Sequence, residues 1–168
     1  HDHGIKVCID ACQTIGTHEF DIFTVDYAVF SGHKMYGPTG VGILYGRLDW
    51  SKFKTLMQGG DTVNHYDFKG NIDFKEGPTK HEPGTLNIAG ILGLGVAAEY
   101  INYITYKEIT RHMNNVDFAL GDAGLFDIKG LNFIYPNYRQ NGRYVYSFTC
   151  EGFHPTDLSA LLSLDNIA

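Results

Sequence analysis

One lysine, Lys34, ends the segment SGHK at residues 31–34 and is followed at once by the glycine-containing segment MYGPTG. The apolar run Tyr27–Phe30 just before it is short and aromatic enough to be a buried strand, so we expect Lys34 just past a strand end. Ligands of open α/β sheets bind outside the carboxyl ends of the strands. Ser31 and His33 could hold phosphate oxygens there while the Lys34 amine reaches an aldehyde, which predicts a Schiff-base lysine.

A carboxylate and an amide follow a second apolar run, Ile5–Ile9. Asp10 ends this run, so we expect it too at the carboxyl end of a strand. A pyridoxal phosphate site needs such a carboxylate against the pyridine nitrogen, because the pairing keeps the ring protonated and able to absorb electrons. Gln13 could donate a hydrogen bond to the phenolic oxygen of the ring.

Each of these residues also has an ordinary structural interpretation. Lys34 alone could be a solvent-facing lysine near a glycine turn, and Ser31 or His33 could simply cap or form that turn. Asp10 could cap the turn that follows it, and Gln13 could be a surface amide. Their order and spacing together favour the cofactor site.

Four segments carry a resemblance to a known family: IDACQ at 9–13, FSGHKMYGPTGVGILYG at 30–46, QGGD at 58–61 and EPGTLN at 82–87. In order and spacing they resemble the central part of a SufS-like (group II) cysteine desulfurase, in the class V aminotransferase family. Cys12 stands where those proteins usually have a small residue, and Leu86 replaces a proline. These two departures affect the assignment of the subgroup more than that of the cofactor.

The resemblance implies a role for each matching residue. The lysine is the catalytic residue that bonds to pyridoxal 5'-phosphate, the aspartate pairs with its pyridine nitrogen, the glutamine contacts its phenolic oxygen, and the serine and histidine hold its phosphate. The threonine of the last segment reaches the phosphate in the neighbouring subunit, which implies a homodimer. These roles fall on Lys34, Asp10, Gln13, Ser31, His33 and Thr85.

The fold implied by the resemblance is α/β, the fold type I of pyridoxal-phosphate-dependent transferases, present only in part. Residues 1–85 would belong to the large cofactor-binding domain, and residues 86–168 to the end of that domain and a truncated small C-terminal domain. Members of the family carry a nucleophilic cysteine on a loop beyond the region that residues 152–168 resemble. We therefore expect a fragment that lacks this cysteine and is inactive alone.

The implied reaction converts L-cysteine to L-alanine and passes the sulfur, as a persulfide, to a SufE- or SufU-like acceptor protein for iron–sulfur cluster assembly. Two alternatives stay open. One is a selenocysteine lyase or another class V relative, because the same cofactor site serves several reactions. The other is a non-catalytic, truncated remnant that only binds the cofactor or has a structural role.

Composition indicates a soluble α/β protein, with 43% hydrophobic residues and a net charge of −6. Because the chain has no apolar run of ~18 residues and no excess of basic residues, we expect neither a membrane nor a nucleic acid as partner. The two histidines near the start, His1 and His3, lack the further ligands that a metal site needs, so we expect no metal.

Three cysteines form no CxxC pair and no even disulfide set, which favours a reducing compartment. We expect the protein in the cytoplasm, or in an organellar matrix or stroma if it is eukaryotic. Cys8 and Cys150 lie in apolar runs and are expected in the core. Cys12 is nearer the predicted ring, where packing is a better interpretation than attack on sulfur.

The hydrophobic pattern also predicts the surrounding elements. A mostly buried helix with glycines for close packing is expected at 87–103, and an excursion of loops and short strands along the dimer interface at 61–84. The remaining expected elements are strands at 5–9, 26–30, 41–46 and 143–149, and helices at 49–57, at 106–120 and after Pro155, the last with Thr156 or Asp157 near its cap.

Overall fold

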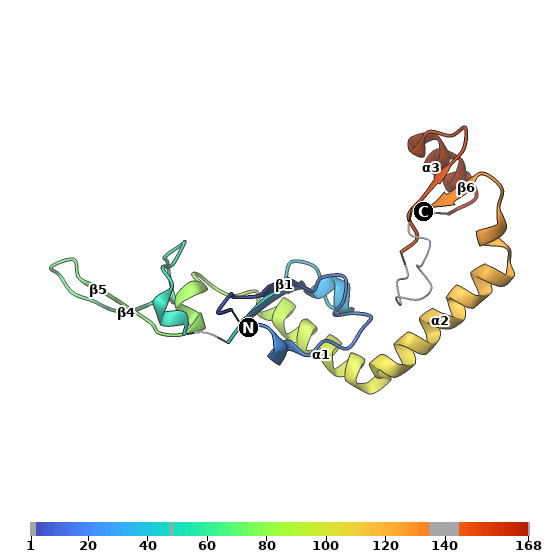
Figure 1. Cartoon of the computed structure of the whole chain (residues 1–168). Coiled ribbons are helices and arrows are strands. Elements are labelled where there is room, and N and C mark those ends of the chain that lie inside the picture. Colours follow the sequence, from blue (N-terminus) through green and yellow to red (C-terminus); the bar gives the residue numbers. More distant parts are fainter. Residues whose placement is uncertain (1–2, 48, 135–144, 168) are drawn as a thin grey trace. The chain divides into compact units, whose positions relative to one another are not determined.

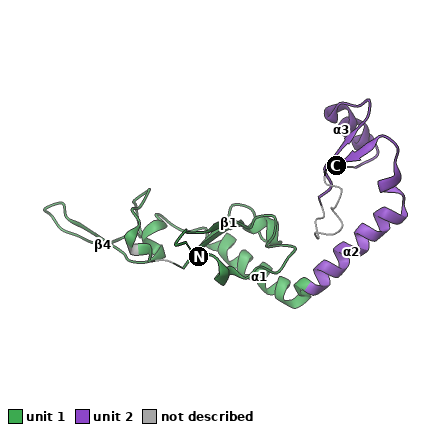
Figure 2. Cartoon of the chain, in the orientation of Figure 1, with its two compact units in different colours: residues 1–106 green, residues 107–168 purple. Residues whose placement is uncertain are grey.

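The structure of the chain is a computed structural model that describes residues 3–47, 49–134 and 145–167 (Figure 1). It divides into two compact units, residues 1–106 and residues 107–168, which we describe separately (Figure 2). The domain boundary predicted at residues 85 and 86 concerns the complete family fold and stays a prediction.

A three-stranded sheet forms the centre of the first unit. It contains β1 (Cys8–Asp10), β2 (Tyr27–Ser31) and β3 (Gly42–Gly46), in the order β1-β2-β3. β1 pairs with β2 in parallel and β2 pairs with β3 antiparallel, with Asp10 opposite Val29. The three predicted strands are confirmed, although β1 is shorter and ends one residue later than expected. The parallel pairing places the carboxyl ends of β1 and β2 at one edge of the sheet.

Burial on β2 alternates as expected for a strand with one face on a core. Ala28 and Phe30 are buried, whereas Tyr27, Val29 and Ser31 are half-buried. The other buried apolar residues of this unit come from the turns beside the sheet and from the following helix: Ala11, Val25, Met35, Leu94, Ala97 and Ile101.

A buried carboxylate pins β1 against β2. Asp26 is only 7% exposed, its Oδ2 accepts a hydrogen bond from the Val7 N–H at 2.9 Å, and the Lys6 ammonium lies 3.2 Å from its Oδ1. The backbone N–H groups of Asp26 and Tyr27 both donate to the Val7 carbonyl. The Val7 N–H, and to a smaller extent Lys6, hold the pKa of the Asp26 carboxyl below its ordinary value although burial opposes this.

Residues 49–86 form turns and a hairpin. The hairpin of β4 (Val63–Tyr66) and β5 (Ile72–Phe74) projects away from the sheet, as Figure 1 shows. The predicted excursion of loops and short strands is confirmed, and its place along a dimer interface stays a prediction. The short 3₁₀ helices are η1 (Ile22–Thr24), η2 (Gly32–Met35), η3 (Trp50–Lys52), η4 (Pro78–His81) and, in the second unit, η5 (Leu125–Asp127).

The helix predicted at 49–57 is wrong, because only the 3₁₀ turn η3 forms there. The ring of Trp50 packs against Tyr27 and His81, at centroid distances of 6.4 and 5.6 Å. Leu56, which an amphipathic helix would bury, is fully exposed. Aromatic packing at the start of the segment thus outweighs its local helical pattern.

The longest helices are α1 (Ile88–Ile104) and α2 (Tyr106–Asp122), and both were predicted. α1 runs beside the sheet (Figure 1) and buries Gly90, Leu94, Ala97 and Ile101 on one face. The expectation that it is mostly buried is wrong for this chain, because its other face exposes apolar side chains. These are Ile88, Ile91, Leu92, Val96, Tyr100 and Tyr103.

No single helix among the described residues is both long and apolar enough to cross a membrane, whereas α1 and α2 taken together, as a bent pair, pass by length and composition only.

The second unit contains most of α2, a two-stranded sheet of β6 (Leu131–Phe133) and β7 (Phe148–Cys150), and α3 (Pro155–Leu164). β6 was not predicted. The strand predicted at 143–149 corresponds to β7, which begins later, and residues 143 and 144 lie outside the described residues. The cap of α3 is His154, whose Nδ1 accepts from the Thr156 N–H, and not Thr156 or Asp157.

The predicted burial of two cysteines is wrong in this structure. Cys8 is exposed and Cys150 is half-buried. Both lie in short strands whose other residues are themselves partly exposed, so an apolar run did not imply a core position.

We expect the Asp26→Asn substitution to destabilise the protein in a pH-dependent way. Because the pKa of Asp26 is lowered in the folded state, its stabilisation is present above the unfolded value of 3.8 and is lost as the pH falls through the lower folded value. Thermal unfolding followed by circular dichroism between pH 7 and pH 3 measures this. Wild type should lose the extra stability on acidification, and the difference from the variant should shrink.

The exposed Glu99 on α1 provides the control, as Glu99→Gln should leave the unfolding midpoint at neutral pH unchanged. An Asp26→Asn protein as stable as wild type at neutral pH would contradict the prediction.

Candidate functional site

Lys34 lies in the 3₁₀ turn η2, which directly follows β2 as predicted. The Gly32 N–H donates to the Val41 carbonyl at 2.9 Å, and the N–H groups of Tyr36 and Gly37 both donate to the Gly32 carbonyl. The turn is therefore closed by its own backbone. Ser31 occupies the cap position but its side chain makes no capping hydrogen bond, so the capping alternative does not apply to its hydroxyl.

Close packing against nearby backbone, and also against α1, explains two glycines of this turn. A Cβ atom at Gly32 would lie 2.9 Å from the Val41 carbonyl oxygen, and one at Gly37 would lie 2.9 Å from the Gly32 carbonyl oxygen. Both would also crowd the Leu94 side chain, at 3.3 and 3.1 Å. The Leu94 side chain of α1 therefore packs against the turn that carries Lys34, a contact that was not predicted from the sequence.

A third glycine, Gly16, lies against the backbone of the lysine itself. A Cβ atom at Gly16 would come within 2.1 Å of the Lys34 carbonyl oxygen. The Tyr36 hydroxyl donates to the Gly16 carbonyl at 3.1 Å, and the Tyr106 hydroxyl donates to the Ile15 carbonyl at 2.8 Å. Two tyrosines therefore hold the segment that touches Lys34.

The two tyrosines differ in what the structure shows of them, a strained backbone for Tyr36 and a raised pKa for Tyr106. Tyr36 has a φ of 65°, which costs about 1–2 kcal/mol for a residue with a side chain, and its ring meets Tyr100 edge-on at 6.1 Å. Burial, followed by the negative charge of Glu19, raises the pKa of Tyr106 above its ordinary value of 10.0. Tyr106 therefore stays protonated and remains a hydrogen-bond donor at neutral pH.

Asp10 ends β1 and is an ionised carboxylate. Hydrogen bonds from the Cys12 thiol and from the Cys12 backbone N–H, the latter at 2.9 Å from Oδ1, lower the pKa of the Asp10 carboxyl below its ordinary value. The positive charge of Lys34 lowers this pKa further. The structure thus brings Asp10 and Lys34 near enough to interact electrostatically, as the parallel pairing of their strands requires.

Three other residues predicted to bind the cofactor, Ser31, His33 and Gln13, differ in their contacts with the rest of the predicted site. The Ser31 Oγ lies 3.6 Å from the Cys12 Sγ, which joins the ends of β1 and β2. His33 shares the turn with Lys34, and both side chains are exposed. Gln13 is also exposed, and no interaction within the described residues ties its amide to the other four.

Thr85 lies elsewhere in the first unit. It lines an open hollow of about 430 Å³ together with Gly60, Asp61, Gly84 and two apolar residues. The Gly84 N–H donates to the Gly60 carbonyl at 2.7 Å, so the QGGD and EPGTLN segments meet here. No contact within the described residues brings Thr85 to Lys34, and its place in a neighbouring subunit's site stays a prediction.

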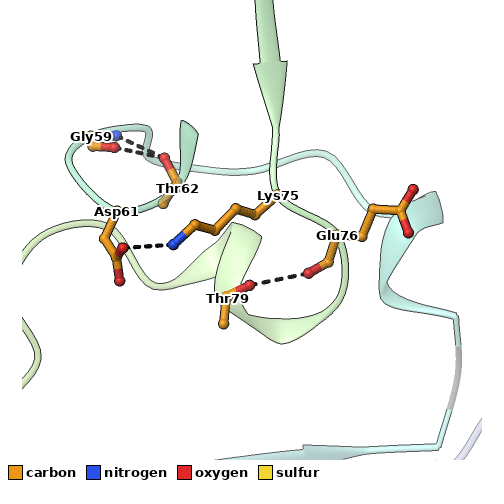
Figure 3. A network of polar contacts seen from close by, with 6 residues as sticks. All are labelled: Gly59, Asp61, Thr62, Lys75, Glu76 and Thr79. Atoms are coloured by element: carbon orange, nitrogen blue, oxygen red, sulfur yellow. Dashed lines mark hydrogen bonds and ion pairs between the residues drawn. The ribbon is translucent and has the colours of Figure 1, made fainter. Parts of the chain in front are cut away.

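A polar network holds this hollow in place (Figure 3). Lys75 reaches back from the hairpin and its ammonium pairs with Asp61 at 2.6 Å. The fully buried Thr62 donates its hydroxyl to the Gly59 carbonyl at 2.7 Å, and the Thr79 hydroxyl donates to Glu76. Of these residues, Gly59 and Asp61 belong to the QGGD segment, and the other four lie outside the four segments.

One amide connects the Thr85 segment to the loop behind Lys34. Asn87 caps α1, with its Oδ1 accepting from the Gly90 N–H at 3.0 Å. Its Nδ2 donates to the Gly40 carbonyl at 3.3 Å. Gly93 lets Pro38 pack on the same helix, whereas Gly95 faces open space, so the expected use of the helix glycines for close packing holds for only some of them.

The chemistry of these side chains fits pyridoxal phosphate. An ionised carboxylate suits a protonated pyridine nitrogen, an exposed amine suits an aldehyde, and a hydroxyl and an imidazole suit phosphate oxygens. No group of three potential metal ligands occurs among the residues that the structure describes, and His1 lies outside them.

Known proteins resemble the chain along its whole length. A family model described as "Aminotransferase class-V" matches residues 1–168. A probable cysteine desulfurase of Halalkalibacterium halodurans is 35% identical, over 100% of this chain and 41% of the relative. A cysteine desulfurase of Synechococcus elongatus is 34% identical, over 100% of this chain and 27% of the relative.

Solved structures agree with the fold. The cysteine desulfurase CsdA from Escherichia coli matches with a TM-score of 0.84 at 29% identity, covering 100% of this chain and 41% of that one. A cysteine desulfurase from Thermococcus onnurineus NA1 matches with a TM-score of 0.87 at 31% identity, covering 99% and 42%. The predicted α/β fold is confirmed as a partial one, because the chain spans well under half the length of these proteins.

We expect Gly16→Ala to destabilise the protein by about 1–3 kcal/mol, since the new methyl group must push the Lys34 carbonyl away. Denaturant unfolding measures the change in the free energy of unfolding. Gly95→Ala is the matched control: it adds the same methyl group to open space on a helix and should stabilise by about 0.5–1 kcal/mol. Equal effects of the two substitutions would contradict the packing role of Gly16.

Proposed function

Since the chain belongs to the class V aminotransferase family, we propose that the whole protein is a pyridoxal-phosphate-dependent cysteine desulfurase that converts L-cysteine to L-alanine. The observation that carries the proposal is the placement of Asp10 at the end of β1 and of Lys34 in the turn that follows β2, at the same edge of two parallel strands. The names of the relatives, all at about one-third identity, support the choice of reaction.

Each residue of the site has a task that its geometry suits. Lys34 would hold the cofactor aldehyde through Nζ, and the same nitrogen, when free, would remove the α-proton of cysteine. Asp10 would hold the proton on the pyridine nitrogen, Ser31 and His33 would donate to the phosphate, and Gln13 would donate to the phenolic oxygen. Bound pyridoxal phosphate would supply the electron sink for the charge left at the α-carbon.

The fate of the sulfur belongs to the same proposal. A thiolate would attack the substrate sulfur, so that a sulfur–sulfur bond forms as the Cβ–S bond of cysteine breaks; the electron pair of that bond stays with the carbon chain, which takes up a proton to give alanine. The resulting persulfide would pass its sulfur to a SufE- or SufU-like acceptor for iron–sulfur cluster assembly. The resemblance assigns this thiolate to a loop that follows the region matched by residues 152–168, and we do not assign it to Cys8, Cys12 or Cys150.

The finer assignment is to the SufS-like group and to a homodimer in the cytoplasm or an equivalent organellar compartment. Thr85 would complete the phosphate site of the partner. Its exposed hydroxyl in an open hollow, away from the lysine of its own chain, supports that arrangement.

Replacing Lys34 tests the proposal directly. Borohydride reduction of the full-length protein with pyridoxal phosphate should leave a stable adduct on the peptide that contains Lys34. Lys34→Ala should abolish that adduct and lower alanine formation from L-cysteine by roughly 10³-fold, because the proton-transferring base is lost.

The exposed Lys107 on α2 is the control, and Lys107→Ala should retain both the adduct and the activity. A wild-type protein without an adduct on Lys34 would sink the cofactor assignment. Alanine from selenocysteine but not from cysteine would instead support the selenocysteine lyase alternative.

Asp10→Asn tests the electrostatic partner of the ring. The amide cannot hold the pyridine nitrogen protonated, so turnover of L-cysteine should fall by about 10²-fold while the Lys34 adduct still forms. Steady-state alanine production and peptide mapping give the two readouts. Asp157→Asn, on the exposed first turn of α3, should change neither, and an Asp10→Asn enzyme of full activity would contradict the role.

A further inference from the structure

Cys12 contacts two of the residues that we assign to opposite ends of the cofactor. Its backbone N–H donates to the Asp10 Oδ1 at 2.9 Å, and its Sγ lies 3.6 Å from the Ser31 Oγ. Its side chain is half-buried, between the end of β1 and the end of β2. The other cysteine of this sheet, Cys8, is exposed and has no such contact among the described residues.

We propose that Cys12 is a positioning residue of the cofactor site, whose sulfur holds the Ser31 side chain in place at the edge of the sheet where the phosphate is expected to bind. The inference rests on the proposed function, because it assumes that Ser31 binds the phosphate of pyridoxal phosphate. It is an inference about binding and not about sulfur transfer.

The surroundings of Ser31 explain why such support is needed. A serine hydroxyl rotates freely unless a partner holds it, and the Ser31 side chain makes no hydrogen bond to the turn that it precedes. The thiol is the one hydrogen-bonding partner of this hydroxyl among the described residues. Holding it in place lowers the cost of ordering it when phosphate binds.

The backbone N–H of Cys12 binds Asp10, which we assign to the pyridine nitrogen at the other end of the cofactor. Because the Cys12 N–H fixes the Asp10 carboxylate, one residue sets the separation between the group for the ring nitrogen and the group for the phosphate. Replacing the Cys12 side chain leaves the backbone bond intact but removes the thiol from both Asp10 and Ser31, so a Ser31 variant is needed to separate the part of the effect that belongs to Ser31.

A double-mutant cycle on the full-length protein tests the coupling. The measured quantity is the dissociation constant of pyridoxal phosphate for wild type, Cys12→Ala, Ser31→Ala and the double variant. Cys12→Ala should weaken binding about fivefold, as expected for one neutral hydrogen bond, and should have a clearly smaller effect when Ser31 is already alanine, because only the contact of the thiol with Asp10 is then lost. Cys12→Ser, which can still hold the hydroxyl, should restore most of the loss.

Cys8→Ala is the matched control and should bind like wild type. An equal loss from Cys12→Ala with and without the Ser31 hydroxyl would overturn the inference, since a general packing effect would explain it. So would a Cys12→Ala protein that binds as tightly as wild type.

Alkylation of the wild-type protein needs no variant and covers the case in which a variant fails to fold. Pyridoxal phosphate should slow the reaction of Cys12 with iodoacetamide, as followed by peptide mass spectrometry, and should leave Cys8 unchanged. Equal rates at Cys12 with and without cofactor would overturn the inference. A missing Lys34 adduct overturns the proposed function itself, whereas an adduct with unprotected Cys12 overturns only the role of the thiol.

Discussion

The parallel pairing of β1 with β2 determines where the candidate site lies. It aligns the carboxyl ends of two strands, and therefore Asp10 and Ser31, at one edge of the sheet. Asp26 secures this pairing because it binds the backbone of Val7, the residue just before β1. A one-residue slip of β1 would turn Asp10 to the opposite face and separate it from Lys34.

The lysine turn also depends on the absence of side chains around it. Gly16, Gly32 and Gly37 each allow backbone or Leu94 to approach closer than a Cβ atom would permit. Rigid support of this kind restricts where the Lys34 backbone can go and leaves its long side chain free. An amine that transfers a proton needs this combination, because its nitrogen must reach that proton at a defined position.

Much of this arrangement could be predicted from the residues. The apolar runs before Asp10 and Ser31 indicated strands, and the glycine-rich segment after Lys34 indicated a turn, so the centre of the site was expected correctly. Leu94 and Tyr106 were missed because each acts through a contact with residues remote in sequence, and no local pattern records such a contact. The wrong helix at 49–57 has the same origin, in the long-range packing of Trp50.

The apolar side chains that α1 exposes bear on the thermodynamics of the chain. The heat capacity change of unfolding rises with the apolar area that folding removes from water. Ile88, Leu92 and Val96 are 61%, 67% and 65% exposed in the folded chain, so unfolding adds little new hydration there. These residues therefore add less to the heat capacity change of unfolding than their apolar character would suggest. They add correspondingly little to the curvature of the free energy of unfolding against temperature.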